Sequence, residues 1–314
     1  AGTASSTNAS TLANSINSSA STFGNGEIRA GLAGGFGRVD VGAVNYNSLT
    51  TFTTGQPFGT AIGSGFRTFY INDGQTTSQV RAENAVKYVS PSFNGLTVSL
   101  YKSNKQNKAT DSTPASTATN GLNPQANAFS SSLGAYDQIG TQEIGANYAN
   151  GPLAVSFSQL KQDSLGIAAA SSSMGSSVGA DLTVNTLGAN YAFGAAKVFG
   201  LYQTQKNAAN TTDRKAFSLS GTYTMGSIVL MAQVGELKAD VGTYAGQKSK
   251  LWGLGADYNL SKRTAVYFRA ESIDDKARAM NATVNPQQIA GTNNVAGLTD
   301  QKFGRTAIGI RHAF

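Results

Sequence analysis

Apolar and polar residues alternate along most of this chain, and a period of two predicts β-strands rather than helices. Large apolar residues recur two positions apart, as in the pairs Val98 and Leu100, Trp252 and Leu254, and Ile308 and Ile310. The positions between them carry mostly Gly, Ser, Thr, Asn or charged residues. Each strand is therefore expected to present one apolar face and one polar or small face.

Four stretches repeat one plan: an apolar–Gly–x–x–Tyr strand end, a turn of a few residues, and a second apolar strand. They are residues 144–155, 187–198, 219–230 and 254–266, with looser copies at 32–41 and 88–100. Tight turns rich in Gly, Asn, Ser and Pro between alternating runs predict hairpins. We expect six hairpins and one last strand, or 13 strands in all.

Longer polar segments separate the hairpins, so that short and long connections alternate strictly. The longer segments are residues 47–79, 104–139, 165–180, 206–213, 240–248 and 274–302. A sandwich would mix both kinds of connection at both ends, whereas a transmembrane β-barrel has short turns at one end and long loops at the other. The pattern favours an all-β antiparallel barrel with its apolar face toward lipid and its polar face toward water.

Composition excludes several other classes of protein. The 314 residues include no cysteine and a single histidine, so we expect no metal site, no cofactor and no catalytic pair. The net charge of +7 favours anions, but no dense Lys/Arg tract or motif points to nucleic acid. No stretch approaches the roughly 18 apolar residues of a membrane helix, which rejects a helical membrane protein but not a barrel.

Four tyrosines occupy the same place in the hairpin repeats, next to the short turns. They are Tyr148, Tyr191, Tyr223 and Tyr258. Tyrosine is enriched where a membrane meets water, so we expect an aromatic girdle there. The alternative is that these are ordinary core tyrosines at strand ends.

Several stretches resemble the general diffusion porins of Gram-negative outer membranes, in particular the trimeric porins of betaproteobacteria. They are "GGFGRVDVG" (34–42), "ENAVKYVSPSFNGLTVSLY" (83–101), "YNLSKRTAVY" (258–267) and the terminal "GIRHAF" (309–314). The resemblance runs from about residue 23 to 314. It implies a 16-stranded barrel, a homotrimer in outer-membrane lipid, and passage of small ions and solutes. It also implies that Ile310 and the terminal Phe314 form the signal read by the outer-membrane insertion machinery.

The chain departs from the family in strand number. Thirteen strands are visible where the family has 16. The missing ones correspond to the family's first three strands, because residues 1–22 read as a loop. We expect the sequence to be a fragment of a longer protein whose N-terminal part completes the wall. The alternative is that another segment completes it.

The resemblance assigns the segment 47–79 to the family's third loop, which folds into the barrel and narrows it. Five apolar residues favour packing inside a lumen: Phe52, Phe58, Ile62, Phe66 and Phe69. The only charges in this segment are Arg67 and Asp73. The alternatives are a surface loop or part of a trimer contact.

Alternation places further charged residues on the water-facing side of the strands. They are Arg29, Arg38, Asp40, Arg81, Glu83, Lys87, Arg269, Glu271, Arg305 and Arg311. Together they predict a basic lumen that prefers small anions, although any one of them could be a solvated charge at the rim. Three rival functions stay open: a substrate-specific anion channel, a plugged barrel acting as adhesin or structural protein, and, least favoured, a soluble β-rich enzyme.

Overall fold

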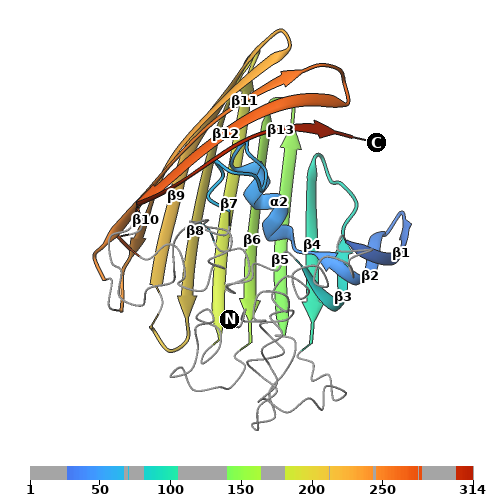
Figure 1. Cartoon of the computed structure of the whole chain (residues 1–314). Coiled ribbons are helices and arrows are strands. Elements are labelled where there is room, and N and C mark those ends of the chain that lie inside the picture. Colours follow the sequence, from blue (N-terminus) through green and yellow to red (C-terminus); the bar gives the residue numbers. More distant parts are fainter. Residues whose placement is uncertain are drawn as a thin grey trace, which may run out of the picture.

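The computed structural model describes residues 27–66, 70, 81–104, 140–163, 181–211, 213–242, 245–274, 276–277 and 302–313. They form one 13-stranded antiparallel sheet in which each strand pairs with the next along the chain (Figure 1). The strands are β1 Ile28–Gly34, β2 Gly37–Asn45, β3 Arg81–Val89, β4 Leu96–Ser103, β5 Thr141–Asn150, β6 Leu153–Gln162, β7 Leu182–Phe193, β8 Ala196–Asn207, β9 Asp213–Met225, β10 Ile228–Ala239, β11 Lys248–Asn259, β12 Thr264–Asp274 and β13 Lys302–His312.

Within the described residues, the predicted hairpins and the count of 13 strands are confirmed. The turns of the β5–β6, β7–β8 and β9–β10 hairpins are two residues long, and each begins with a glycine at positive φ: Gly151, Gly194 and Gly226. A left-handed residue there lets the turn follow the right-handed twist of its strands. The connections after β8 and β10 are shorter than expected, because these strands and their partners extend into residues assigned to the loops.

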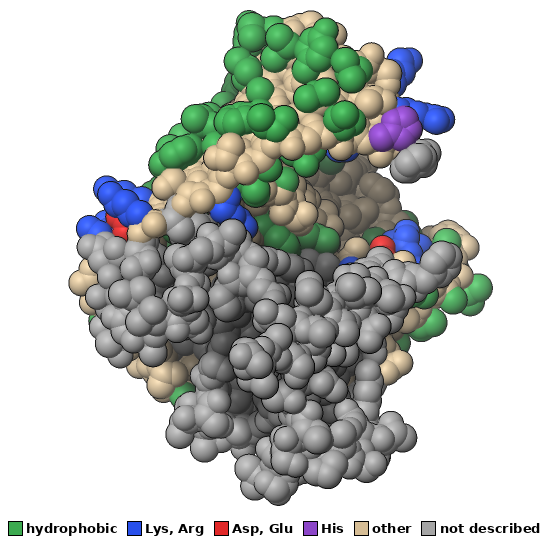
Figure 2. Space-filling view, viewed as in Figure 1, with side chains coloured by type: hydrophobic (Ala, Val, Ile, Leu, Met, Phe, Trp, Pro, Cys, Tyr) green, Lys and Arg blue, Asp and Glu red, His purple; other side chains and the backbone are tan. Residues whose placement is uncertain are grey.

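The two faces of the sheet are also those that alternation predicts. The large apolar side chains lie on the outer face, where Leu32, Ile308 and Ile310 are all more than 70% exposed. Figure 2 shows hydrophobic side chains covering the outer face of the sheet at the top of the view. The inner face carries polar side chains such as Ser158 and Gln203, which are almost fully buried.

A short helix and the segment after it lie on the inner face. Helix α2 (Asn47–Thr54) contacts β5, β6 and β7, and the sheet curls around it (Figure 1). Phe52 and Phe66 of this segment pack against inward-facing Leu237, Leu251 and Ile273 of the wall. The inner face is therefore apolar on β10, β11 and β12, where Phe52 and Phe66 rest, although the sequence pattern indicated a polar or small inner face.

A β-bulge breaks the alternation in β3. The register with β2 shifts between Gly42 and Val44, and Asn84 has a φ of 52°. Ala82 and Ala85, three residues apart, are consequently both buried on the inner face. Arg81 falls on the face opposite Ala82, so the expectation that Arg81 shares a face with Lys87 is wrong.

The edges of the sheet are β1 and β13, which lie on the same side of the view in Figure 1. Among the described residues no pairing joins these two strands. The expectation that further strands complete the wall stays a prediction, and residues 1–22 lie outside the described part of the chain. No helix in the described ranges is long and apolar enough to cross a membrane.

Candidate functional site: the inner face and its inserted segment

Residues 46–66, here called the inserted segment, begin at a wall carboxylate. Glu143 of β5 accepts hydrogen bonds from the backbone N–H groups of Asn47 and, at 2.7 Å, of Ser48. These N–H groups belong to the first turn of α2, which has no partner within the helix for them. Tyr46 at the N-cap offers no side-chain cap, so Glu143 both satisfies these donors and opposes the positive end of the helix dipole.

Polar side chains of the wall hold the rest of α2. The Thr51 and Ser156 hydroxyl oxygens lie 2.7 Å apart, and Asn190 Nδ2 donates to the carbonyl oxygen of Thr54 at 2.7 Å. The helix comes this close because the wall residue beneath it is Gly188. A Cβ there would lie 2.8 Å from the backbone nitrogen of Gly55.

The far end of the inserted segment is held by a second wall carboxylate. Glu271 Oε2 of β12 accepts hydrogen bonds from the backbone N–H groups of Gly63 at 3.0 Å and Gly65 at 2.8 Å. Its other oxygen, Oε1, accepts from Arg305 Nε at 3.1 Å and Nη2 at 2.5 Å. Gly253 of β11 leaves room for this approach, since a Cβ there would lie 2.8 Å from the Cα of Gly63. The segment thus spans the inner face from β5 to β12.

A second ion pair lies beside this anchor. Arg269 Nη2 lies 2.7 Å from Asp257 Oδ1, and Arg311 Nη2 lies 3.6 Å from Asp257 Oδ2. The guanidinium of Arg269 also lies over the rings of Tyr267 and Phe58, at 5.4 Å and 5.9 Å from their centroids. Stacking and pairing together fix the orientation of Arg269.

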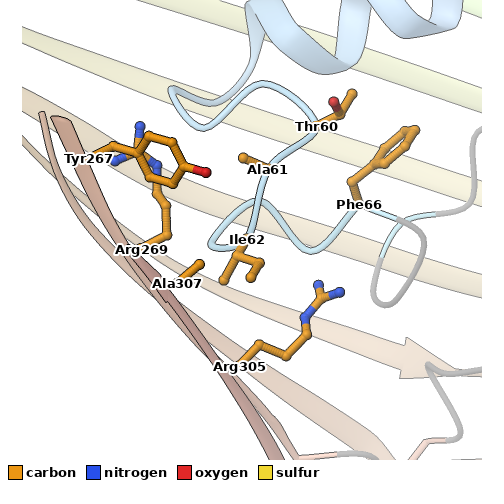
Figure 3. Close-up of a pocket in the computed structure, with 8 residues that line it drawn as sticks. All are labelled: Thr60, Ala61, Ile62, Phe66, Tyr267, Arg269, Arg305 and Ala307. Carbon is orange, nitrogen blue, oxygen red and sulfur yellow. The ribbon is translucent and has the colours of Figure 1, made fainter. Parts of the chain in front are cut away.

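A pocket of about 510 Å³ lies between the inserted segment and the last two strands (Figure 3). Its lining residues are Thr60, Ala61, Ile62, Phe66, Tyr267, Arg269, Arg305 and Ala307. Figure 3 shows the Arg305 guanidinium pointing from β13 toward the segment, with Ile62 beside it. The pocket therefore has apolar walls and two cationic groups.

A third cluster of charges lies on β1 and β2. Asp40 Oδ2 lies 2.8 Å from Arg38 Nε and 3.2 Å from Arg29 Nη1. Lys87 of β3, which is paired in register with Asp40, donates from Nζ to the carbonyl oxygen of Asn45 at 2.8 Å. Arg81 reaches the same asparagine, with Nη1 3.4 Å from Asn45 Oδ1.

The acids and the bases of these clusters differ in exposure. The side chains of Asp40, Asp257 and Glu271 are 4%, 8% and 0% exposed. Their partners Arg38, Arg305 and Arg311 are 42%, 21% and 66% exposed, whereas Arg269, the nearer partner of Asp257, is 8% exposed. A solute near the inner face therefore meets cationic groups, while the paired carboxylates lie beneath them.

The structure brings together most of the charged residues named from alternation. Arg29, Arg38 and Asp40 form one cluster. Arg269 and Arg305 line the pocket, Glu271 pairs with Arg305, and Arg311 lies 3.6 Å from Asp257, the partner of Arg269. Arg67, Asp73, Phe69 and Phe314 lie outside the described residues, as does the side chain of Glu83. Ile310 is exposed on the outer face of β13, paired with Val266.

Sequence reasoning missed the roles of Glu143 and Asp257. Alternation does place both on the inner face, because their neighbours Ile144 and Tyr258 are apolar and exposed. The partners of Glu143 lie 95 and 96 residues away along the chain, so no local motif reveals the contact. The one signal in the sequence is an acidic residue at an inward-facing position whose neighbours on the same face are uncharged.

The four repeated tyrosines lie on the outer face, near the short turns. Tyr191, Tyr223 and Tyr258 are 40%, 51% and 52% exposed, and Tyr148 is half-buried. Each lies a few residues before the turn of its hairpin.

Comparison with known proteins gives a consistent result. The family model described as "Gram-negative porin" matches residues 5–278. The chain is 26% identical over 291 residues to "Outer membrane porin protein 32" of Delftia acidovorans, covering 90% of this chain and 72% of that protein.

Solved structures show the same fold. The "Anion-selective porin from Comamonas acidovorans" matches with a TM-score of 0.62 and 22% identity, over 92% of this chain and 78% of that one. The outer-membrane expressed OmpT of Vibrio cholerae matches with a TM-score of 0.53 and 17% identity, over 90% of this chain and 79% of that one.

Proposed function

The chain belongs to the Gram-negative porin family, and from this premise we propose how its channel selects solutes. The protein is an outer-membrane diffusion channel for small hydrophilic solutes. Its wall is a β-barrel whose apolar outer face meets lipid. The channel prefers small anions. Membership of a family of channels supports this function over the soluble enzyme.

The observation that carries the anion preference is the burial of the inner-face acids beneath their basic partners. Asp257 and Glu271 are each less than 10% exposed, whereas Arg305 and Arg311 reach the open side of the same ion pairs. The carboxylates of Glu143 and Glu271 also accept hydrogen bonds from backbone N–H groups of the inserted segment, which lie between them and the passage. Passing ions are therefore exposed mainly to guanidinium groups, and low-dielectric walls strengthen that field. The anion selectivity named for the Comamonas acidovorans porin agrees with this proposal.

The segment 47–79 forms the constriction of a single barrel domain that takes in residues 1–314. Its described part is tied to the wall at both ends, by Glu143 at α2 and by Glu271 near Gly63. A segment held across the inner face narrows the passage at the pocket lined by Arg269 and Arg305. Lys87 and the Arg38–Asp40 pair would contribute to the opposite side of the passage.

Two further features follow from the family. The four tyrosines form a girdle at the membrane interface near the short turns, since three of them are exposed on the outer face and Tyr148 is half-buried there. The chain assembles as a homotrimer, and Ile310 with Phe314 serves as the signal for insertion.

Reversal potentials in planar bilayers under a KCl gradient test the selectivity. Wild-type protein should show a chloride-selective sign, and Arg305→Gln should move the reversal potential toward zero because it removes the exposed charge at the pocket. Lys262→Gln, in the exposed β11–β12 turn, is the control and should leave selectivity unchanged. A cation-selective wild type would overturn the proposal. Absence of any conductance would favour the plugged barrel, and conductance blocked by micromolar solute would favour a substrate-specific channel.

A further inference from the structure

The pocket between the inserted segment and the last two strands combines apolar surface with a partly exposed cation. Ala61 of its lining is exposed, and Ile62, Ala307 and Tyr267 are half-buried. Figure 3 shows Ile62 pointing from the segment toward β13, with Ala307 on one side of it and Arg305 on the other. Apolar surface that stays in contact with water is unfavourable, so a ligand with an apolar body would gain by covering it.

Contacts on both sides of the pocket fix its shape. A Cβ at Gly309 of β13 would lie 2.5 Å from the Tyr267 hydroxyl oxygen, so the Tyr267 ring lies close against that strand. The guanidinium of Arg269 lies 5.4 Å from the centroid of the same ring. On the other side, Glu271 binds two backbone N–H groups that follow Ile62 in the segment. The volume of about 510 Å³ lies within the roughly 300–1,000 Å³ of small-molecule sites.

Arg305 is the cation that a ligand in the pocket would meet. Its side chain is 21% exposed while it binds Glu271, and its guanidinium points toward the segment in Figure 3. Arg269, the other basic residue of the lining, is only 8% exposed and pairs with Asp257. A guanidinium presents its N–H donors in one plane, which matches the two oxygens of a carboxylate. The pocket therefore suits a ligand that carries one carboxylate.

The charges around the pocket also favour a single negative charge. The described inner-face side chains of β11, β12 and β13 carry three bases and two acids, an excess of one positive charge: Arg269, Arg305, Arg311, Asp257 and Glu271. The facing part of the segment, residues 56–66, carries no charge. A monoanion balances this excess. The second carboxylate of a dianion would lie against the apolar lining, where an unpaired charge is costly.

We propose that this pocket binds monocarboxylates whose apolar body is about the size of one ring, with benzoate as the probe. The carboxylate accepts hydrogen bonds from Arg305, and the ring covers Ile62, Ala307 and the exposed part of Tyr267. This inference rests on the proposed channel function, because the solute reaches the pocket through the lumen, and it names a class of solute that the passage holds. Binding must be weak, since a conducting pore requires its solutes to leave.

The first test compares four ligands on the purified wild-type protein in a non-ionic detergent, by saturation-transfer difference NMR titrations. Benzoate has the ring and one charge, benzamide the ring alone, acetate the charge alone, and terephthalate the ring with two charges. Benzoate should bind at least about 10-fold more tightly than each of the others, because the charged hydrogen bonds and the buried ring each contribute about that factor. Benzoate binding no tighter than benzamide, acetate or terephthalate would overturn the proposal.

A substitution of the apolar lining places the site. Ile62→Ser should weaken benzoate binding by about 5-fold, because it removes most of the apolar contact that Ile62 offers. Leu49→Ser is the matched control, since Leu49 belongs to the same segment, is half-buried and lies outside the lining of the pocket. It should bind benzoate as the wild type does. Equal loss in both variants, or no loss in either, would overturn the proposal.

These binding measurements involve no ionic current, so their result does not depend on the selectivity of the channel. An anion-selective channel that does not bind benzoate would overturn this inference and leave the proposed function standing. A cation-selective channel that binds benzoate in the expected order would support this inference and overturn the proposed selectivity. The comparison of ligands on the wild type decides the question even if the Ile62 variant fails to fold.

Discussion

Replacing Glu271 by glutamine should release the far end of the inserted segment. The carboxylate lies fully buried and accepts four hydrogen bonds, two from the backbone N–H groups of Gly63 and Gly65 and two from Arg305. Glutamine has nearly the same shape, but one of its two ends donates. The amide oxygen should turn toward the Arg305 guanidinium, whose charged donors bind an oxygen more strongly than neutral N–H groups do, so the N–H groups of Gly63 and Gly65 lose their acceptor.

The size of the effect follows from those bonds. A hydrogen bond to a charged group contributes about 1.5–3 kcal/mol, so losing two weakens attachment by about 3 kcal/mol or more. That figure agrees with the roughly 3–5 kcal/mol that follows removal of one partner of a buried ion pair. Since about 1.4 kcal/mol is a factor of ten, the ratio of detached to attached segment should rise about 100-fold.

Single-channel recording in planar bilayers measures this change. Wild type should show quiet open-channel current, and Glu271→Gln should show frequent transitions between conductance levels as the segment leaves and rejoins the wall. Glu236→Gln is the matched control, because Glu236 is paired with Lys248 on the outer face, away from the segment. Indistinguishable current noise in the Glu271 variant and the wild type would show that other contacts hold the segment, and the reasoning would fail.

Two further outcomes follow from other parts of the wall. Gly188→Ala should lower the midpoint temperature of heat-induced unfolding, followed on gels, because the added Cβ would meet the backbone of Gly55. Overpacking of this kind costs about 1–3 kcal/mol of stability. Gly200→Ala is the control and should leave the midpoint unchanged, because the space around Gly200 is open. The ammonium groups of Lys215 and Lys238 lower the pKa of Asp240, which lies just after β10, from 3.8 to about 2. A lowered pKa contributes stability that is fully present above about pH 4 and is lost as pH falls through about 2. The difference in unfolding midpoint between wild type and Asp240→Asn should accordingly shrink between those two pH values, and a difference that disappears near neutral pH would contradict this assignment.

Much of the wall was predictable because strand geometry is local. A period of two decides which side chains share a face, so Leu254 and Ile310 could be assigned to the outer face without knowledge of the fold. Glycine at positive φ, as at Gly151 and Gly194, follows from turn chemistry within four residues. The same local reasoning failed at Arg81, because the bulge at Asn84 depends on how β3 meets β2.

The amino-acid sequence by itself determined the strands, their hairpins and the apolar face that each presents, since all of these depend on neighbours a few residues apart. Only the tertiary structure decided what the inner-face charges do. Glu143 and Glu271 find their partners 95 and 206 residues away, in backbone N–H groups that any sequence would supply. Such contacts depend on where the inserted segment lies in the curved sheet, and the curvature arises from all the strands together.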